Sequence, residues 1–281
     1  MIKYLKFAFL SLLVCTAPLH ASTAETDVAT LGWHEFVRGD FREAIVLGRT
    51  AGTANGYALA CRSGLTLGGF VVKGTETITL LHDAATDCQK ALALNPDHYF
   101  ARMSLAIALS FEGKRLRRVA YAKRAKVYIQ DLIAAEPDNA LGYGALAAWH
   151  AEVSAAGFWA RLLLGAKRKL ARENFQKALG MGAIDFPLQF EYVKFLARGN
   201  GADRLRAVEL ADAIKAQPSS LAVDMLIKER CARLRPVLIR GGKKAIRAAL
   251  KEVSAFRHIE DLAAIEPFPL TEPAIPASQT S

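Results

Sequence analysis

Small and apolar residues recur along this chain at the spacing of helices that pack on one another. Residues 84–97 read Ala-x3-Cys-x2-Ala-Leu and close with Asn-Pro-Asp, and residues 125–138 read Ala-x3-Ile-x2-Leu-Ile and close with Glu-Pro-Asp. A small residue followed four and seven positions later by packing residues marks one face of a helix, and the proline marks its end. The pattern therefore predicts helical units that repeat along the chain.

The same pattern, with less regular flanks, predicts five such units. Successive units are separated by 40, 41, 46 and 36 residues, and the extra residues of the third unit are expected around residues 114–119. A helical unit of this size cannot bury its apolar face alone, so the units must stack on one another. The alanines in equivalent positions are Ala44, Ala84, Ala125, Ala171 and Ala207.

The first unit allows a comparison with a known repeat. It carries Leu31-Gly32 in its first helix, Gly39-Asp40-Phe41 at the turn and Ala44-Ile45 in its second helix. These residue types, in this order, resemble the tetratricopeptide repeat (TPR), a helix-turn-helix unit of about 34 residues. The resemblance extends over roughly residues 28–220.

The resemblance implies an all-α fold, a right-handed α-solenoid of about five divergent TPR-like helix pairs followed by C-terminal capping helices. It further implies a concave groove that binds an extended peptide or another protein. Glu35 and Gly48 depart from the family, which usually has a tyrosine or phenylalanine at both positions. The competing interpretation is an irregular helical bundle with chance periodicity.

The C-terminal part predicts two helices and a tail. Ser219-Ser220 can cap a helix that runs to about Arg235, where Pro236 interrupts it. A second helix is expected from Lys243 to about Arg257, and the proline-rich residues 259–281 are expected to be disordered. The helical domain is thus predicted to cover residues 25–258.

The first 24 residues have the pattern of a secretory signal peptide. Lys3 and Lys6 precede an apolar run over residues 7–14, Pro18 follows, and Ser22-Thr23-Ala24 fits the small-residue cleavage rule. The expected location is the bacterial periplasm, with an uncleaved N-terminal anchor in the inner membrane as the alternative. A lipoprotein box at Cys15 is disfavoured because Val14 is too large.

The composition indicates a basic protein with enough hydrophobic residues to form a packed core. Hydrophobic residues make up 52% of the chain, which excludes a disordered protein, and the formal net charge is +10. Removal of residues 1–24 takes away two lysines and leaves +8. Such a field favours an acidic protein partner or an anionic membrane surface. Nucleic acid fits the charge but not an exported protein, so no nucleic-acid partner is expected.

Three cysteines remain in the predicted mature chain. Cys61 and Cys88 would lie on neighbouring helices of one unit, which makes them the candidate disulfide pair in an oxidising compartment. The residue type alone favours another interpretation, in which all three cysteines, Cys231 among them, are small buried residues of the core.

The sequence contains no convincing catalytic constellation, so no enzyme activity and no cofactor are predicted. Residues 64–68 (Gly-Leu-Thr-Leu-Gly) have the outline of a nucleophile elbow, but their flanks are helical. Residues 68–74 lack the Gly-Lys-Ser/Thr ending of a phosphate loop. No two histidines have the i, i+4 spacing of helical metal ligands, so no metal site is expected.

A basic run is the first candidate for binding. Its cations coincide with the extra residues of the third unit and are not interrupted by an acidic residue. We expect them to contact a partner, with Tyr143 and Trp149 as candidate aromatic residues of the groove, although packing between helices is the preferred interpretation for Tyr143. The run comprises Lys114, Arg115, Arg117, Arg118, Lys123, Arg124 and Lys126.

An aromatic and leucine-rich segment is the second candidate. Phe158, Trp159 and Leu162 precede Lys167 and Arg168. Apolar residues beside a basic cluster suit a helix in a membrane interface, but they equally suit a helix that packs its apolar side on the repeats, and packing is the preferred interpretation.

The leading functional hypothesis is a non-catalytic, exported TPR-like scaffold that mediates protein–protein interaction in the cell envelope. Its partner would be another envelope protein or an extended peptide, of acidic character. The alternatives are a peripheral membrane or lipid-binding protein, or a substrate-capturing accessory of an envelope transport system.

Overall fold

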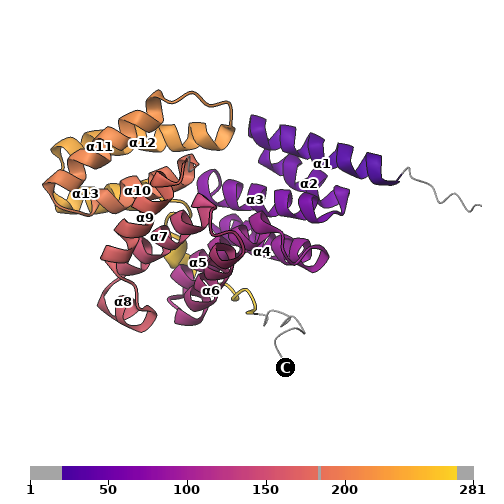
Figure 1. Cartoon of the computed structure of the whole chain (residues 1–281), viewed down its shortest axis with the longest axis horizontal. Coiled ribbons are helices and arrows are strands. Elements are labelled where there is room, and N and C mark those ends of the chain that lie inside the picture. The colour runs from indigo at the N-terminus through magenta and orange to yellow at the C-terminus, as the bar shows by residue number, and fades with distance from the viewer. Residues whose placement is uncertain (1–20, 183–184, 271–281) are drawn as a thin grey trace, which may run out of the picture.

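The computed structural model describes residues 21–182 and 185–270, and this part of the chain is helical without any strand (Figure 1). The all-α prediction is therefore confirmed. The predicted signal peptide lies outside the described residues except for residues 21–24, where the first helix begins. The helices are α1 (Ala21–Arg38), α2 (Phe41–Ala51), α3 (Ala54–Phe70), α4 (Thr75–Leu94), α5 (Tyr99–Leu116), α6 (Val119–Ala135), α7 (Ala140–Ala155), α8 (Phe158–Leu164), α9 (Arg168–Gly180), α10 (Phe186–Ala197), α11 (Gly201–Ala216), α12 (Ala222–Arg240), α13 (Lys243–Val253) and the 3-10 helix η1 (Ile259–Leu262).

Most helices that follow one another along the chain also pack on one another, but α7 packs mainly on α9 rather than on the short α8, and α10 packs on α7 and α11. The predicted equivalent alanines lie on every second long helix of this series, namely α2, α4, α6, α9 and α11, and all are buried. A methyl group at the point of closest packing lets each helix approach its neighbours. Local polar caps then fix where helices begin, as Asp40 does by accepting a hydrogen bond from the Glu43 amide.

The contact of α2 with α3 explains one departure from the repeat pattern. A Cβ atom on Gly48 would stand 2.6 Å from the carbonyl oxygen of Gly56, and one on Gly56 would stand 2.4 Å from that of Gly48. The backbones of the two helices thus touch where the TPR pattern would have an aromatic residue. Only glycine allows that approach.

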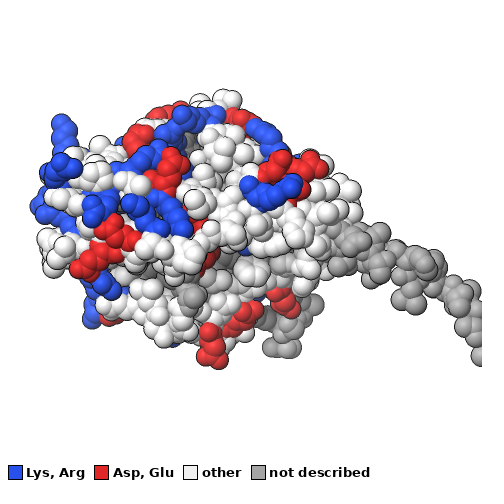
Figure 2. Space-filling model, turned by 90° about the horizontal axis from the view of Figure 1, so that it is seen from above, with Lys and Arg blue, Asp and Glu red and all other residues white. Residues whose placement is uncertain are grey.

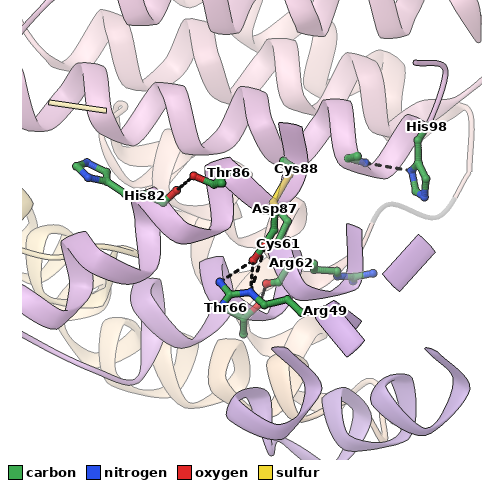
Figure 3. The surroundings of a disulfide bond; sticks show 10 residues. Arg49, Cys61, Arg62, Thr66, His82, Thr86, Asp87, Cys88 and His98 are labelled. Carbon is green, nitrogen blue, oxygen red and sulfur yellow. Dashed lines mark hydrogen bonds and ion pairs between the residues drawn. A yellow bond between two sulfur atoms is a disulfide. The ribbon is translucent and has the colours of Figure 1, made fainter. Parts of the chain in front are cut away.

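The disulfide between Cys61 of α3 and Cys88 of α4 ties these two helices together (Figure 3). Their Cα atoms are 5.3 Å apart, and Cys231 is a buried free thiol. The candidate pairing is correct, and the preferred interpretation of three reduced core cysteines is wrong for two of them. Next to the disulfide, Arg49 of α2 donates to the carboxylate of Asp87 at 2.9 Å.

Helix α12 differs from its prediction because it runs through Pro236 to Arg240. Leu234 and Leu238, on either side of the proline, are buried in the core that α10 to α13 share. Continued burial of this apolar face compensates for the backbone hydrogen bond that proline removes. The start of α12 also returns to the N-terminal helices, since Val223 shares a core cluster with Phe36 and Phe41 (Figure 1).

The predicted disorder from residue 259 onward is wrong for residues 259–270. After α13 the chain continues as a C-terminal segment (residues 254–270) that crosses α3, α4, α5 and α6. Its side chains Phe256, Ile259 and Phe268 are buried in the core cluster of these helices. Residues 271–281 lie outside the described residues. Within the described residues, no helix has the length and apolar character that crossing a bilayer requires.

Candidate functional site

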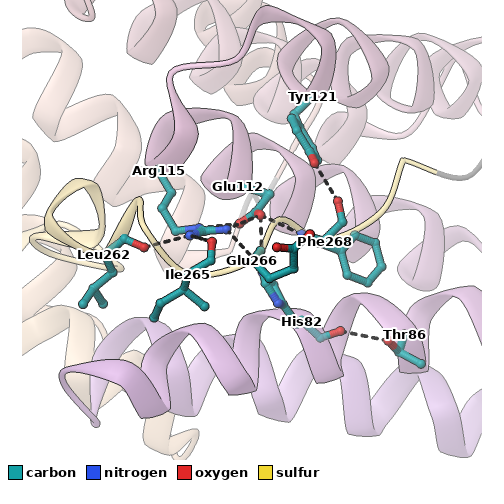
Figure 4. Close-up of polar contacts among 9 residues, drawn as sticks. All are labelled: His82, Thr86, Glu112, Arg115, Tyr121, Leu262, Ile265, Glu266 and Phe268. Carbon is teal, nitrogen blue, oxygen red and sulfur yellow. Dashed lines mark hydrogen bonds and ion pairs between the residues drawn. The ribbon is translucent and has the colours of Figure 1, made fainter.

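The C-terminal segment is held by Arg115, whose side chain is fully buried (Figure 4). Its Nη1 atom donates to the carbonyl oxygens of Leu262 at 2.7 Å and Ile265 at 2.8 Å, and Nη2 donates to that of Glu266 at 3.3 Å. A guanidinium group presents five donors in a fixed fork. Arg115 therefore recognises the main chain of a bent segment at three carbonyl groups.

Glu112, one helical turn before Arg115, completes this recognition. Its carboxylate accepts two hydrogen bonds from Arg115, at 2.8 and 2.6 Å, and one from the amide of Phe268 at 2.9 Å. Burial raises the pKa of Glu112, but hydrogen bonds from Arg115, His82 and the Phe268 amide outweigh burial and lower that pKa to about 2. The carboxylate is consequently charged and paired.

Phe268 is enclosed between α4 and α6. Its carbonyl oxygen accepts a 2.6 Å hydrogen bond from the Tyr121 hydroxyl, and its ring lies 5.7 Å from the ring of His82. The His82 Nε2 atom is in turn 3.3 Å from Glu112. We call His82, Glu112, Arg115 and Tyr121 the docking surface (Figure 4).

A second anchor lies at the other end of the segment. The amide of Phe256 donates to the carbonyl of Gly69 at 2.9 Å. The centre of the Phe256 ring lies 4.5 Å from the centre of the Phe111 ring. A Cβ on Gly69 would stand 2.9 Å from the Phe256 ring. The glycines that outline a nucleophile elbow in the sequence are thus part of helix α3, and Gly69 makes room for Phe256.

The docking surface contacts the C-terminal segment mainly through the backbone of that segment. It contacts four carbonyl groups and one amide, and the deepest side chain that it accepts is an aromatic ring. Contacts to the backbone tolerate many sequences, whereas an enclosed ring selects one residue type. The segment held in this way is a 3-10 helix and turn over residues 259–265, followed by residues without regular structure.

The predicted basic run is divided by the fold. Arg115 is not part of an exposed basic surface, because its side chain is buried under the C-terminal segment. The turn between α5 and α6 consists of residues 117–118 only, so the expected insertion lengthens two helices instead of forming a loop. Lys114 lies 3.5 Å from Glu260 of the segment. Arg117, Arg118 and Lys123 are exposed, and Arg124 and Lys126 are half-buried.

The two predicted groove aromatics serve packing. Trp149 is buried and donates its indole N–H to the Ala122 carbonyl at 2.9 Å, while Lys126 lies over its ring, so it is not a groove residue. Tyr143 is half-buried, with the Lys177 ammonium 3.7 Å from its ring centre.

The segment around Phe158 forms the separate short helix α8, and the preferred interpretation that it packs its apolar side inward is wrong. Phe158, Trp159 and Leu162 are all exposed. The two residues Lys167 and Arg168, which follow α8, each contact the rest of the fold. The Lys167 amide donates to His150 at 3.4 Å, and the Arg168 guanidinium lies over the Phe195 ring. Burial lowers the pKa of His150 to about 4, so this histidine is a neutral acceptor.

A basic surface on α12 and α13 was missed by the sequence analysis. Residues 230–251 contain no acidic residue. On the face shown in Figure 2, lysines and arginines gather over the half that holds α11, α12 and α13. This run of cations without an acidic residue is as clear in the sequence as the basic run that begins at Lys114. Its exposed members are Arg233, Arg240, Lys243, Lys244, Arg247 and Lys251.

The docking surface itself was also missed, apart from Arg115. Among the described residues, no cluster of three or more His, Cys, Asp or Glu side chains is arranged to hold a metal ion. The sequence matches no known protein-family model, and no curated protein resembles it significantly.

Proposed function

We propose that this protein is a non-catalytic scaffold that binds a peptide segment of another protein at the docking surface. The observation that carries the proposal is the hydrogen bonding of Arg115, Glu112 and Tyr121 to the backbone of residues 262–268. A surface that binds one short stretch of chain, here a turn followed by irregular residues, through its backbone can bind another. The C-terminal segment then stands in for the partner and must leave before the partner enters.

The proposed architecture follows from the same repeats. We take α1/α2, α3/α4, α5/α6, α7/α9 and α10/α11 as divergent TPR-like pairs of a right-handed solenoid, with α12/α13 as the capping pair. Burial of the equivalent alanines on the second helix of each pair supports this assignment. The docking surface lies on α4, α5 and α6, which are the second helix of one proposed pair and both helices of the next.

We place the protein outside the cytoplasm, in the bacterial cell envelope, on the basis of its predicted signal peptide. The Cys61–Cys88 disulfide supports this location, because disulfides persist in oxidising compartments. The exposed Arg117, Arg118 and Lys123 lie at the end of α5 and on α6, near the docking surface. Their charge favours a partner with acidic residues beside its bound segment.

A peptide added in trans tests the docking surface directly. The probe is a fluorescently labelled peptide of residues 260–270, titrated with the full chain and with a Phe268→Ala variant whose own segment is less firmly held. We expect anisotropy to rise with both chains, and more steeply with the variant. A peptide that carries Phe268→Ala is the matched control and should bind at least about tenfold more weakly, because it lacks the enclosed ring. Equal binding of both peptides, or no binding to the variant, would contradict the proposal.

The partner is then sought by crosslinking in intact cells, followed by affinity capture of the tagged chain. An envelope protein captured by the wild type and enriched by Phe268→Ala, but lost on Arg117→Gln/Arg118→Gln/Lys123→Gln, agrees with the proposal. Capture that is unchanged by all of these substitutions would place the partner at another surface.

A further inference from the structure

Helix α8 presents a continuous apolar face to solvent. Phe158, Trp159, Leu162 and Leu163 have exposed fractions of 59%, 71%, 60% and 60%, and α8 has no buried residue. Residues spaced by one, four and five positions share one side of a helix. Single exposed hydrophobic residues are common on soluble proteins, but a cluster of four on one helix marks an interaction site.

Two glycines bound this helix, which contacts α6 and α7. Gly157 and Gly165 flank α8 with φ angles of 130° and 64°, which other residues rarely adopt, and no atom lies within 4 Å of a Cβ atom built on either. Figure 1 shows α8 at the edge of the molecule, beyond α7 and α9. Its four apolar side chains remain exposed there.

The charge around α8 has a single sign. Residues 153–172 include Arg161, Lys167, Arg168, Lys169 and Arg172 and contain no acidic residue. Arg172 is paired with Asp203 at 3.0 Å, and Arg168 lies over the Phe195 ring, so both are engaged within the fold. Arg161 is exposed within α8, where it lies over the Phe158 ring, and Lys167 is exposed just after the helix.

From this arrangement we infer that α8 docks the protein on an anionic lipid bilayer, with its four apolar side chains in the interface and its cations at the lipid phosphates. Tryptophan and phenylalanine are well suited to the boundary between headgroups and acyl chains, and adjacent cations add attraction to anionic lipids. A specific protein interface buries about 800 Å² on each partner. Four partly exposed side chains fall short of that area, whereas shallow insertion into a bilayer needs no larger surface. This inference goes beyond peptide binding and does not rest on it.

Co-sedimentation of the full chain with vesicles tests the inference. The vesicles contain equal parts of phosphatidylglycerol and phosphatidylcholine, and pure phosphatidylcholine is the neutral comparison. We expect binding to the anionic vesicles that weakens as salt increases, and a shift of tryptophan emission to shorter wavelength that Trp159→Phe removes. Trp159→Glu/Leu163→Glu should lower the partition coefficient at least about tenfold, since both side chains are exposed in the free protein and enter the bilayer only on binding.

A matched pair of charge variants separates α8 from the basic surface of α13. Arg161→Gln/Lys167→Gln/Lys169→Gln and Lys243→Gln/Lys244→Gln/Arg247→Gln each remove three exposed cations. Only the first is expected to weaken vesicle binding, by about tenfold or more. Circular dichroism confirms that each variant is folded. Equal weakening by both variants, or a wild-type chain that does not sediment with anionic vesicles, would overturn the inference.

Discussion

Arg115 and Glu112 lie one turn apart on α5 and join their side chains through two hydrogen bonds where solvent is excluded. A buried ion pair of this kind adds little stability by itself, because both groups lose their hydration. Here both partners also bind the backbone of the C-terminal segment, so the pair connects α5 to a stretch of chain about 150 residues away.

Loss of Arg115 is therefore expected to destabilise the whole fold. Arg115→Met leaves the Glu112 carboxylate buried without its main partner, and we expect the free energy of unfolding to fall by about 3–5 kcal/mol. Addition of Glu112→Leu should restore part of this loss, since it removes the unpaired charge. Urea denaturation followed by circular dichroism measures the change. Lys123→Met, on the exposed side of α6, is the control and should change stability by less than about 0.5 kcal/mol. Similar losses for Lys123→Met and Arg115→Met would contradict this role.

Low pH should weaken the connection between Glu112 and the C-terminal segment. The pKa of Glu112 is lowered from 4.5 to about 2 in the folded chain, so its contribution to stability is complete above about pH 5 and is lost as the pH falls toward 2. The expected contribution is on the order of 2–3 kcal/mol. Unfolding measured from pH 6 to pH 2 should decline more steeply for the wild type than for Glu112→Gln, which cannot ionise. Parallel pH profiles would show that Glu112 is not the group responsible.

The helical fold could be predicted because its signals are local. The buried alanines recur with helical partners at +4 and +7, and a proline follows each of the two clearest units. The candidate pairing of Cys61 with Cys88 was accessible for the same reason, since the two lie on helices that are adjacent in the chain.

The docking surface could not be predicted because its signals are distant. Arg115 looks like any other cation of its run until Leu262 and Ile265 supply carbonyl groups 147 and 150 residues later. Proline-rich composition suggested disorder, but a segment whose carbonyls and amide are bonded by buried side chains does not need its own regular structure. Pro236 led to the wrong prediction that the helix ends at about Arg235. The burial of Leu234 and Leu238 outweighs the backbone hydrogen bond that the proline removes.

The disulfide should contribute measurably to stability. It closes a loop between residues 27 positions apart, for which the chain-entropy relation gives about 3–4 kcal/mol. Cys61→Ala/Cys88→Ala is expected to unfold at lower temperature by a corresponding amount. Dithiothreitol should lower the melting temperature of the wild type to a similar value and leave that of the double variant unchanged. A wild type that is insensitive to the reductant would show that the bond is absent from the purified protein.

The contact between Gly69 and Phe256 predicts how the C-terminal segment can be loosened without a change of charge. A Cβ atom on Gly69 would stand 2.9 Å from the Phe256 ring, so Gly69→Ala should displace the segment and weaken its docking by about 1–3 kcal/mol. Trypsin cleavage after the half-buried Arg257, identified by mass spectrometry, should then be roughly tenfold faster, because local opening becomes easier. Phe256→Leu, which has a smaller side chain, should partly restore protection when combined with Gly69→Ala. Gly180→Ala is the matched control, since no atom lies within 4 Å of the added methyl group. If Gly69→Ala and Gly180→Ala are cleaved at the same rate, the ring of Phe256 does not hold the segment in place.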